Sequence, residues 1–172
     1  MSEARGARDP AKPGVTIVAA CAPGDMAEVR ALFEEYADWL QVDLCFQGFA
    51  AELASLPGRY APPEGGLWFA KVEGETAGIV GLRPLDAAPG ETGVCELKRL
   101  WIRTPYRGLG LGRRLTETAL EAAKAAGYAR ICLDTLPMMG EAQALYRSLG
   151  FVEIPAYYHN PEDGVMYLER RL

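Results

Sequence analysis

Apolar residues recur at the spacing of an amphipathic helix in several stretches of the chain. In the stretch that follows Asp25, positions 29, 32, 33, 36 and 40 are all apolar or aromatic. Asp25 is the predicted N-cap of this helix, because Glu28 follows three residues later and completes a capping box. The predicted helices are 25–40, 49–56, 113–126 and 141–149.

Short runs rich in apolar and β-branched residues alternate with these helices and predict strands. Two of the runs flank Glu73–Glu75, which predicts a β-hairpin. The longest run ends before Pro105, because proline cannot donate a hydrogen bond to a β-ladder. A helix and a further strand follow it, which implies a right-handed parallel crossover. The predicted strands are 15–20, 67–72, 76–82, 94–102, 130–134, 151–154 and 165–169.

Length and composition fit one globular α/β domain. The chain has 172 residues, of which 49% are hydrophobic and 24% are charged, so it can bury a core of its own. Residues 1–14 are charged and small, with two prolines, and predict a disordered leader before a single domain at 15–172. The net charge of −5, without a basic block, argues against a nucleic-acid partner.

The remaining compositional signals concern compartment and metals. No apolar run is long enough to cross a membrane, and no secretion signal is present, which predicts a cytoplasmic protein that does not bind membranes. We interpret Cys21, Cys45, Cys95 and Cys132, which form no C-x-x-C pair, as small buried apolar side chains in a reducing cytoplasm. With His159 as the only histidine, no metal is expected.

A glycine-rich segment connects the longest predicted strand to the third predicted helix. Gly108, Gly110 and Gly112 lack a Cβ, so the backbone can reach conformations closed to other residues and a ligand can approach it closely. The free N–H groups and the dipole at the start of the helix favour an anion there. Arg107 and Arg113 flank the glycines with donors that suit phosphate oxygens. The segment therefore predicts a phosphate-binding turn.

The spacing within this turn discriminates between phosphate ligands. A Walker loop requires lysine and then serine or threonine after its last glycine, but Arg113 and Arg114 follow Gly112, which excludes it. A dinucleotide site requires glycine where Arg113 stands, yet Asp134 lies near the place of its acidic residue, so this alternative stays open. A glycine-rich connection without any ligand is the other alternative.

Two motifs resemble those of the GNAT superfamily of N-acetyltransferases. The pattern Arg-x-x-Gly-x-Gly at 107–112 is similar to the coenzyme A pyrophosphate loop of that family. The pattern Ala-x-x-Leu-Tyr-x-x-x-Gly-Phe at 142–151 is similar to its carboxyl-side element. Two motifs in the right order are more specific than either alone. The resemblance covers about 15–172 and implies the GNAT fold, an α/β architecture of the α+β type. Its mixed sheet of about six or seven strands, with about four helices, has an antiparallel amino-terminal half and parallel strands flanking the coenzyme site.

The resemblance also implies an activity. It implies direct transfer of an acetyl group from acetyl-CoA, as co-substrate, to the primary amine of a small molecule or peptide. It leaves a homodimer open. Two other classes of function remain as alternatives: a catalytically idle acyl-CoA-binding sensor module, and a dinucleotide-binding oxidoreductase.

Two catalytic roles are assigned through the resemblance. Glu96 lies where the family places its catalytic carboxylate, and it would remove a proton from the amine directly or through water. Its alternative role is a carboxylate paired with Lys98 or Arg99 on a face of the sheet. Tyr146 matches the tyrosine that faces the coenzyme sulfur and would protonate the leaving thiolate, the alternative being a core aromatic.

Coenzyme contacts are also expected from the resemblance, whereas aromatic residues of the sequence are the candidates for the acceptor pocket. A backbone N–H near Leu100 would stabilise the oxyanion, and Met139 replaces an asparagine that often contacts the coenzyme in the family. Candidates to line the acceptor pocket are Trp39, Tyr60, Trp68, Tyr157 and Tyr158. The predicted coenzyme-binding residues are Leu100, Trp101, Ile102, Arg107, Gly108, Gly110, Leu111, Gly112 and Arg113.

Overall fold

The computed structural model describes residues 13–86 and 91–172, which contain strands, four α-helices and short 3₁₀ turns. The strands are β1 (Val15–Ala19), β2 (Gly66–Val72), β3 (Glu75–Pro84), β4 (Val94–Ile102), β5 (Arg130–Thr135), β6 (Val152–Ile154) and β7 (Met166–Arg171). The helices are α1 (Asp25–Leu40), α2 (Phe49–Ala54), α3 (Leu111–Ala125) and α4 (Gly140–Ser148). The 3₁₀ turns are Cys45–Gln47, Gly58–Tyr60 and Thr104–Tyr106.

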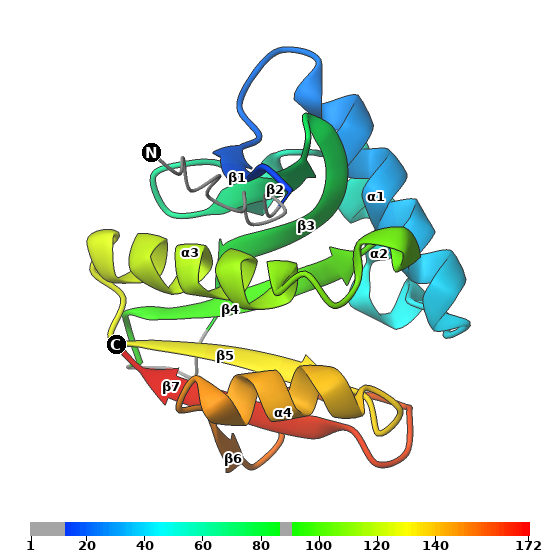
Figure 1. Cartoon of the computed structure of the whole chain (residues 1–172). Helices are drawn as coiled ribbons and strands as arrows, with labels where there is room; N and C mark the ends of the chain where they lie inside the picture. Colours follow the sequence, from blue (N-terminus) through cyan, green and yellow to red (C-terminus); the bar gives the residue numbers. More distant parts are fainter. Residues whose placement is uncertain (1–12, 87–90) are drawn as a thin grey trace, which may run out of the picture.

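Within the described residues the seven strands form one mixed sheet in the order β1-β2-β3-β4-β5-β7-β6 (Figure 1). β4 and β5 are parallel neighbours, and the other neighbouring pairs are antiparallel. The antiparallel amino-terminal half and the parallel pair after it confirm the predicted architecture. The helical crossover from β4 to β5 is α3.

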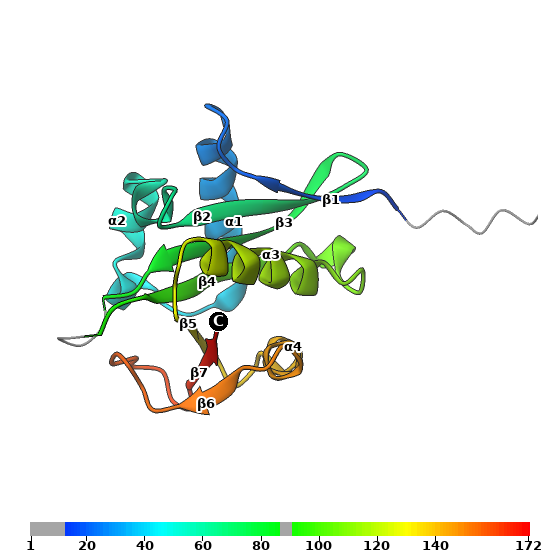
Figure 2. The same ribbon diagram turned by 90° about the vertical axis from the view of Figure 1, so that its left-hand side faces the viewer.

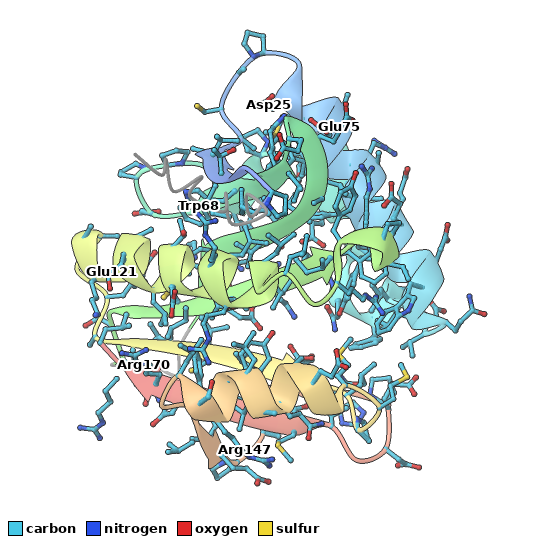
Figure 3. The ribbon with its side chains drawn as sticks, viewed as in Figure 1. Asp25, Trp68, Glu75, Glu121, Arg147 and Arg170 are labelled. Atoms are coloured by element: carbon cyan, nitrogen blue, oxygen red, sulfur yellow. The ribbon has the colours of Figure 1, made fainter. Side chains whose placement is uncertain are left out.

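The helices cover both faces of the sheet. α3 packs on one face through Leu115, Ala119 and Ala123, which are fully buried, and α4 joins the same apolar cluster through Tyr146. α1 and α2 pack on the other face in a second cluster that includes Phe33. Figure 2 gives the view turned by 90°, and Figure 3 adds the side chains, with the exposed residues Glu121 of α3 and Arg147 of α4 labelled.

The predicted hairpin between β2 and β3 is present, with a tighter turn than expected. Glu73 and Gly74 form its two-residue loop, with φ of 49° and 85°. Two positive φ values in succession are typical of a type I′ turn, whose twist matches that of the strands. The carbonyl of Gly14 accepts a hydrogen bond from the N–H of Glu73 at 2.9 Å, so the end of the predicted leader already belongs to the fold. The rest of that leader, residues 1–12, lies outside the described residues.

Two expectations from the sequence are wrong in detail. Asp25 is the first residue of α1 and Gly24 is its N-cap, because the Asp25 carboxylate instead accepts a hydrogen bond from the N–H of Ala22 at 2.7 Å. Cys95 and Cys132 are buried as predicted, but Cys21, in a loop, and Cys45, at the start of a 3₁₀ turn, are exposed. Sequence patterning alone did not reveal that those two cysteines lie outside the elements that build the core.

Candidate active site

The site lies where β4 and β5 separate. Their ladder pairs Val94, Cys95 and Glu96 with Arg130, Ile131 and Cys132, and no later residue of either strand is paired with the other. Figure 1 shows the two strands close together at their start and diverging along their length. A cavity of about 930 Å³ lies there, lined by α1, β4, the glycine loop, the end of β5 and α4.

A β-bulge at Arg99 divides β4 into two parts. Arg99 has a φ of 59°, and the register with β3 shifts between Ile79 and Gly81. One extra residue reverses the alternation of side chains along a strand. Leu100 and Ile102 therefore share the α3 face with Leu97, whereas Trp101 lies on the α1 face in the second cluster.

A buried ion pair holds this bulge in place. Nη2 of Arg99 lies 2.6 Å from Oε2 of Glu52, and the guanidinium stacks over the ring of Phe49 at 5.1 Å. Burial alone lowers the pKa of Arg99, but the carboxylate of Glu52 raises it above its usual value, so both groups stay charged. A non-glycine residue with positive φ is strained, and the ion pair with α2 offsets that strain.

The glycine loop presents backbone donors to the cavity. Gly108 and Gly110 have φ of 82° and 73°, and Gly110 is the N-cap of α3 without any capping side chain. Across the described part of the chain, no protein acceptor takes a hydrogen bond from the N–H groups of residues 108–113. This leaves a row of free amides at a helix N-terminus, which is an anion-binding arrangement. All residues predicted to bind the coenzyme line the cavity.

The two arginines of the loop have different surroundings. The guanidinium of Arg107 lies over the rings of Trp39 and Trp101, at 5.1 Å from each, and its Nε donates to the carbonyl of Ile102 at 3.2 Å. Arg113 donates to Oγ of Ser148 at 2.6 Å. The aromatic contacts fix Arg107 beside the free amides with further N–H donors to offer an anion.

Two of the tyrosines that line the cavity have raised pKa values. Tyr146 on α4 is 5% exposed and packs against Phe151, and none of the described residues accepts a hydrogen bond from its hydroxyl. Burial raises the pKa of Tyr146, and nearby Tyr36 and Asp134 raise it further. Burial is also the main cause that raises the pKa of Tyr36 to about 12. Both hydroxyls therefore hold their protons at neutral pH.

Glu96 lies close to the cavity but is not one of the residues that line it. Its side chain is 2% exposed, and Arg83 contacts Oε2 through two nitrogens, each at 3.1 Å. The hydroxyl of Tyr157 donates to Oε1 at 2.8 Å, and Nζ of Lys98 lies 3.4 Å from the same oxygen. Two of these contacts are hydrogen bonds, from Nε of Arg83 and from the Tyr157 hydroxyl, and the other two are ion-pair contacts. The pairing with Lys98, the alternative role, is present.

Asp134 is a largely buried carboxylate that lines the cavity, and its position in the sequence pointed only to a dinucleotide site. Oδ1 lies 3.1 Å from Nζ of Lys98, and Oδ2 accepts a hydrogen bond from Tyr158 at 2.8 Å. Gln47 accepts from Nζ of Lys98 at 3.2 Å. The sequence feature that could have identified Asp134 is its position near the end of β5. Polar residues at such a position face the gap between the two diverging strands.

The aromatic candidates for the acceptor pocket have different positions. Trp39 lines the cavity, but Tyr60, Trp68, Tyr157 and Tyr158 do not. Tyr157 and Tyr158 instead use their hydroxyls to hold Glu96 and Asp134 from the β6–β7 connection. Met139, at the N-cap of α4, lines the cavity where the family often has asparagine.

A free row of amides after a strand, a cavity between diverging parallel strands and a buried tyrosine on the next helix define a coenzyme-binding transferase of the acyl-transfer class. The model of the acetyltransferase (GNAT) family matches residues 29–151. The chain therefore belongs to the GNAT superfamily and is an acetyl-CoA-dependent N-acetyltransferase.

Relatives and solved structures agree with this assignment. An uncharacterized N-acetyltransferase of Schizosaccharomyces pombe is 37% identical, over 90% of this chain and 93% of its own length. An uncharacterized N-acetyltransferase of Dictyostelium discoideum is 29% identical, over 84% and 94%. An acetyltransferase from Streptococcus agalactiae shares the fold with a TM-score of 0.72 and 21% identity, over 92% of this chain and 99% of its own.

One further structural neighbour contains its coenzyme. The putative acetyltransferase yncA of Salmonella typhimurium, solved with its cofactor acetyl-CoA, has a TM-score of 0.64 and 16% identity, over 91% of this chain and 93% of its own. At this level of identity the likeness concerns the fold. Separately, no helix in residues 13–86 and 91–172 is long and apolar enough to cross a membrane.

Proposed function

We propose that this enzyme transfers the acetyl group directly from acetyl-CoA to the primary amine of a small molecule or peptide. The observation that carries the proposal is the row of free amides at 108–113, next to the cavity into which β4 and Tyr146 also face. These amides and Arg107 bind the pyrophosphate. Leu100, Trp101 and Ile102 lie on the part of β4 unpaired with β5, where amide groups of the pantetheine arm can pair.

In the proposed reaction, the neutral amine nitrogen attacks the thioester carbonyl carbon. The C–N bond forms, a backbone N–H near Leu100 stabilises the oxyanion, and the C–S bond then breaks. The amine nitrogen gives up its proton to water, and the coenzyme thiolate takes a proton from the hydroxyl of Tyr146. Solvent returns that proton to Tyr146.

The four free thiols support the proposed cytoplasmic location.

Glu96 has a positioning role in this proposal. It is ion-paired with Arg83 and Lys98 and does not line the cavity, whereas Lys98, which it contacts, does. We expect Glu96→Gln to lower kcat by about tenfold at neutral and alkaline pH alike, because a positioned charge is lost rather than a titrating base. Initial rates across the pH range measure this, with exposed Glu64→Gln as the control. A loss that disappears at alkaline pH would instead assign Glu96 the role of base.

A panel assay tests the proposed function itself. Acetyl-CoA is incubated with small amines and amino-terminal peptides, and release of free coenzyme thiol is followed. We expect at least one amine to raise thiol release well above the rate without acceptor, with the acetylated amine as product. Tight binding of acetyl-CoA with no acceleration by any amine would favour the idle sensor module instead.

A further inference from the structure

We propose that Asp134 binds the ammonium group of the acceptor, and that the acceptor carries this group on an apolar aliphatic or aromatic body. This inference rests on the proposed acetyl transfer and names the substrate class of the same site. The juxtaposition that carries it is a buried, incompletely used carboxylate beside an apolar wall, both inside one cavity.

Asp134 has unused capacity to accept hydrogen bonds. Its side chain is 11% exposed, and its two oxygens receive one donor each, from Lys98 and Tyr158. A carboxylate can accept about four hydrogen bonds, so Asp134 retains room for an ammonium group. Asp134 also lines the cavity, which Glu96 does not.

The charge of Asp134 depends on its burial and on its neighbours. Burial raises the pKa of this carboxyl group, but Lys98 and the hydroxyl of Tyr158 outweigh burial and hold the pKa below its usual value. Asp134 is therefore an anion at neutral pH. The other acidic residues that line the cavity, Glu141 and Glu162, are exposed, so solvent screens their attraction for an amine.

Lys98 is the cation next to Asp134. Nζ of Lys98 donates to Gln47 and Asp134 at 3.2 and 3.1 Å, and it lies 3.4 Å from Oε1 of Glu96. Lys98 therefore serves to hold Asp134 rather than to bind an anionic substrate. Arg99, another buried cation that lines the cavity, is ion-paired with Glu52, so Asp134 is the largely buried carboxylate of the lining with capacity for a ligand.

Apolar side chains form one wall of the cavity near Asp134. Leu40, Leu44 and Leu136 form a separate buried cluster, with Val42 and Met139 packed against it. All five line the cavity, and Leu136 is two residues from Asp134. Phe46 also lines it and is 37% exposed, next in the chain to Gln47. An apolar body bound near Asp134 would pack against this wall and cover Phe46, its exposed part.

The test measures binding of three matched probes, hexylamine, ethylamine and hexanol, to the protein saturated with coenzyme A, by calorimetry. Hexanol keeps the body of hexylamine and removes its charge, and ethylamine keeps the charge and shortens the body. We expect wild-type protein to bind hexylamine at least tenfold more tightly than either of the others. A buried methylene contributes about 0.8 kcal/mol and a hydrogen bond to a charged group about 1.5–3 kcal/mol.

Three variants locate the two contributions. Asp134→Asn should bind hexylamine no better than hexanol, with coenzyme A affinity unchanged. Phe46→Ala should weaken hexylamine severalfold and leave ethylamine unchanged. Asp163→Asn, the same chemical change at an exposed position of the β6–β7 connection, should match wild type.

Several results would overturn the inference. One is wild-type affinity of Asp134→Asn for hexylamine, and another is equal binding of hexylamine and hexanol to wild type. If Asp134→Asn does not fold, the probe ratios in wild type and in Phe46→Ala decide. Thiol release is measured separately. Turnover of other amines without hexylamine binding rejects this inference alone, whereas Asp134-dependent binding without turnover of any amine rejects the proposed transfer alone.

Discussion

Gly110→Asp is expected to reduce the affinity for acetyl-CoA at least a hundredfold without destabilising the unliganded protein. Gly110 is the N-cap of α3 and has a φ of 73°. Aspartate tolerates this conformation better than most residues and is a favoured N-cap, so its carboxylate would occupy the free amides of the first turn. It would also repel the pyrophosphate. Calorimetric titration with acetyl-CoA and thermal unfolding of the unliganded protein measure the two effects.

A control for this variant lies at the other end of the same helix. Gly127 has a φ of 85° and, like Gly110, open space where a Cβ would stand. Gly127→Asp introduces the same charge and the same backbone demand away from the cavity, so acetyl-CoA should bind as in wild type. Equal affinity of the Gly110→Asp and wild-type proteins for acetyl-CoA would contradict the assignment of the glycine loop.

Tyr146→Phe should lower kcat about a hundredfold, with little change in the dissociation constant for acetyl-CoA. General acid catalysis contributes typically about 10²–10⁴-fold, and phenylalanine keeps the ring contact with Phe151 while removing the proton that the thiolate needs. Single-turnover rates on an active amine separate this step from coenzyme binding.

Tyr128→Phe is the matched control for the loss of a hydroxyl. The Tyr128 hydroxyl donates to the carbonyl of Glu64 at 2.6 Å, away from the cavity, so its removal should change stability and leave kcat unaffected. Full activity of Tyr146→Phe would leave Tyr146 only its packing role and would direct attention to Tyr36, the other cavity tyrosine with a raised pKa.

The parts of the site that the sequence predicted are local. β4, the glycine loop and the start of α3 are consecutive in the chain, so residue spacing alone places Gly108, Gly110 and Arg107 together. The seven strands also follow from short apolar runs with turn residues between them. Such features depend on neighbours within a few residues, which a single sequence displays.

The acceptor side was harder to predict, because it depends on pairings distant in the chain. Lys98 meets Asp134 and Gln47 through the separation of β4 from β5 and the path of the α1–α2 connection. The bulge at Arg99 is equally hidden, since its cause is an ion pair with Glu52 forty-seven residues away. Reading β4 as a regular strand therefore gives the wrong face to every residue after Arg99.

A row of paired charges that extends from the cavity wall into the protein restricts how this enzyme can diversify. Arg83, Glu96, Lys98 and Asp134 alternate in sign along one continuous row, and their formal charges cancel. Replacement of one of these residues by an uncharged one leaves the charge of its neighbour without a partner, which destabilises the fold by about 3–5 kcal/mol where that neighbour is buried. Substitutions that adapt the site to a new acceptor therefore cost least stability in the α1–α2 connection. Side chains such as Phe46 can vary there without a change in the row of charges.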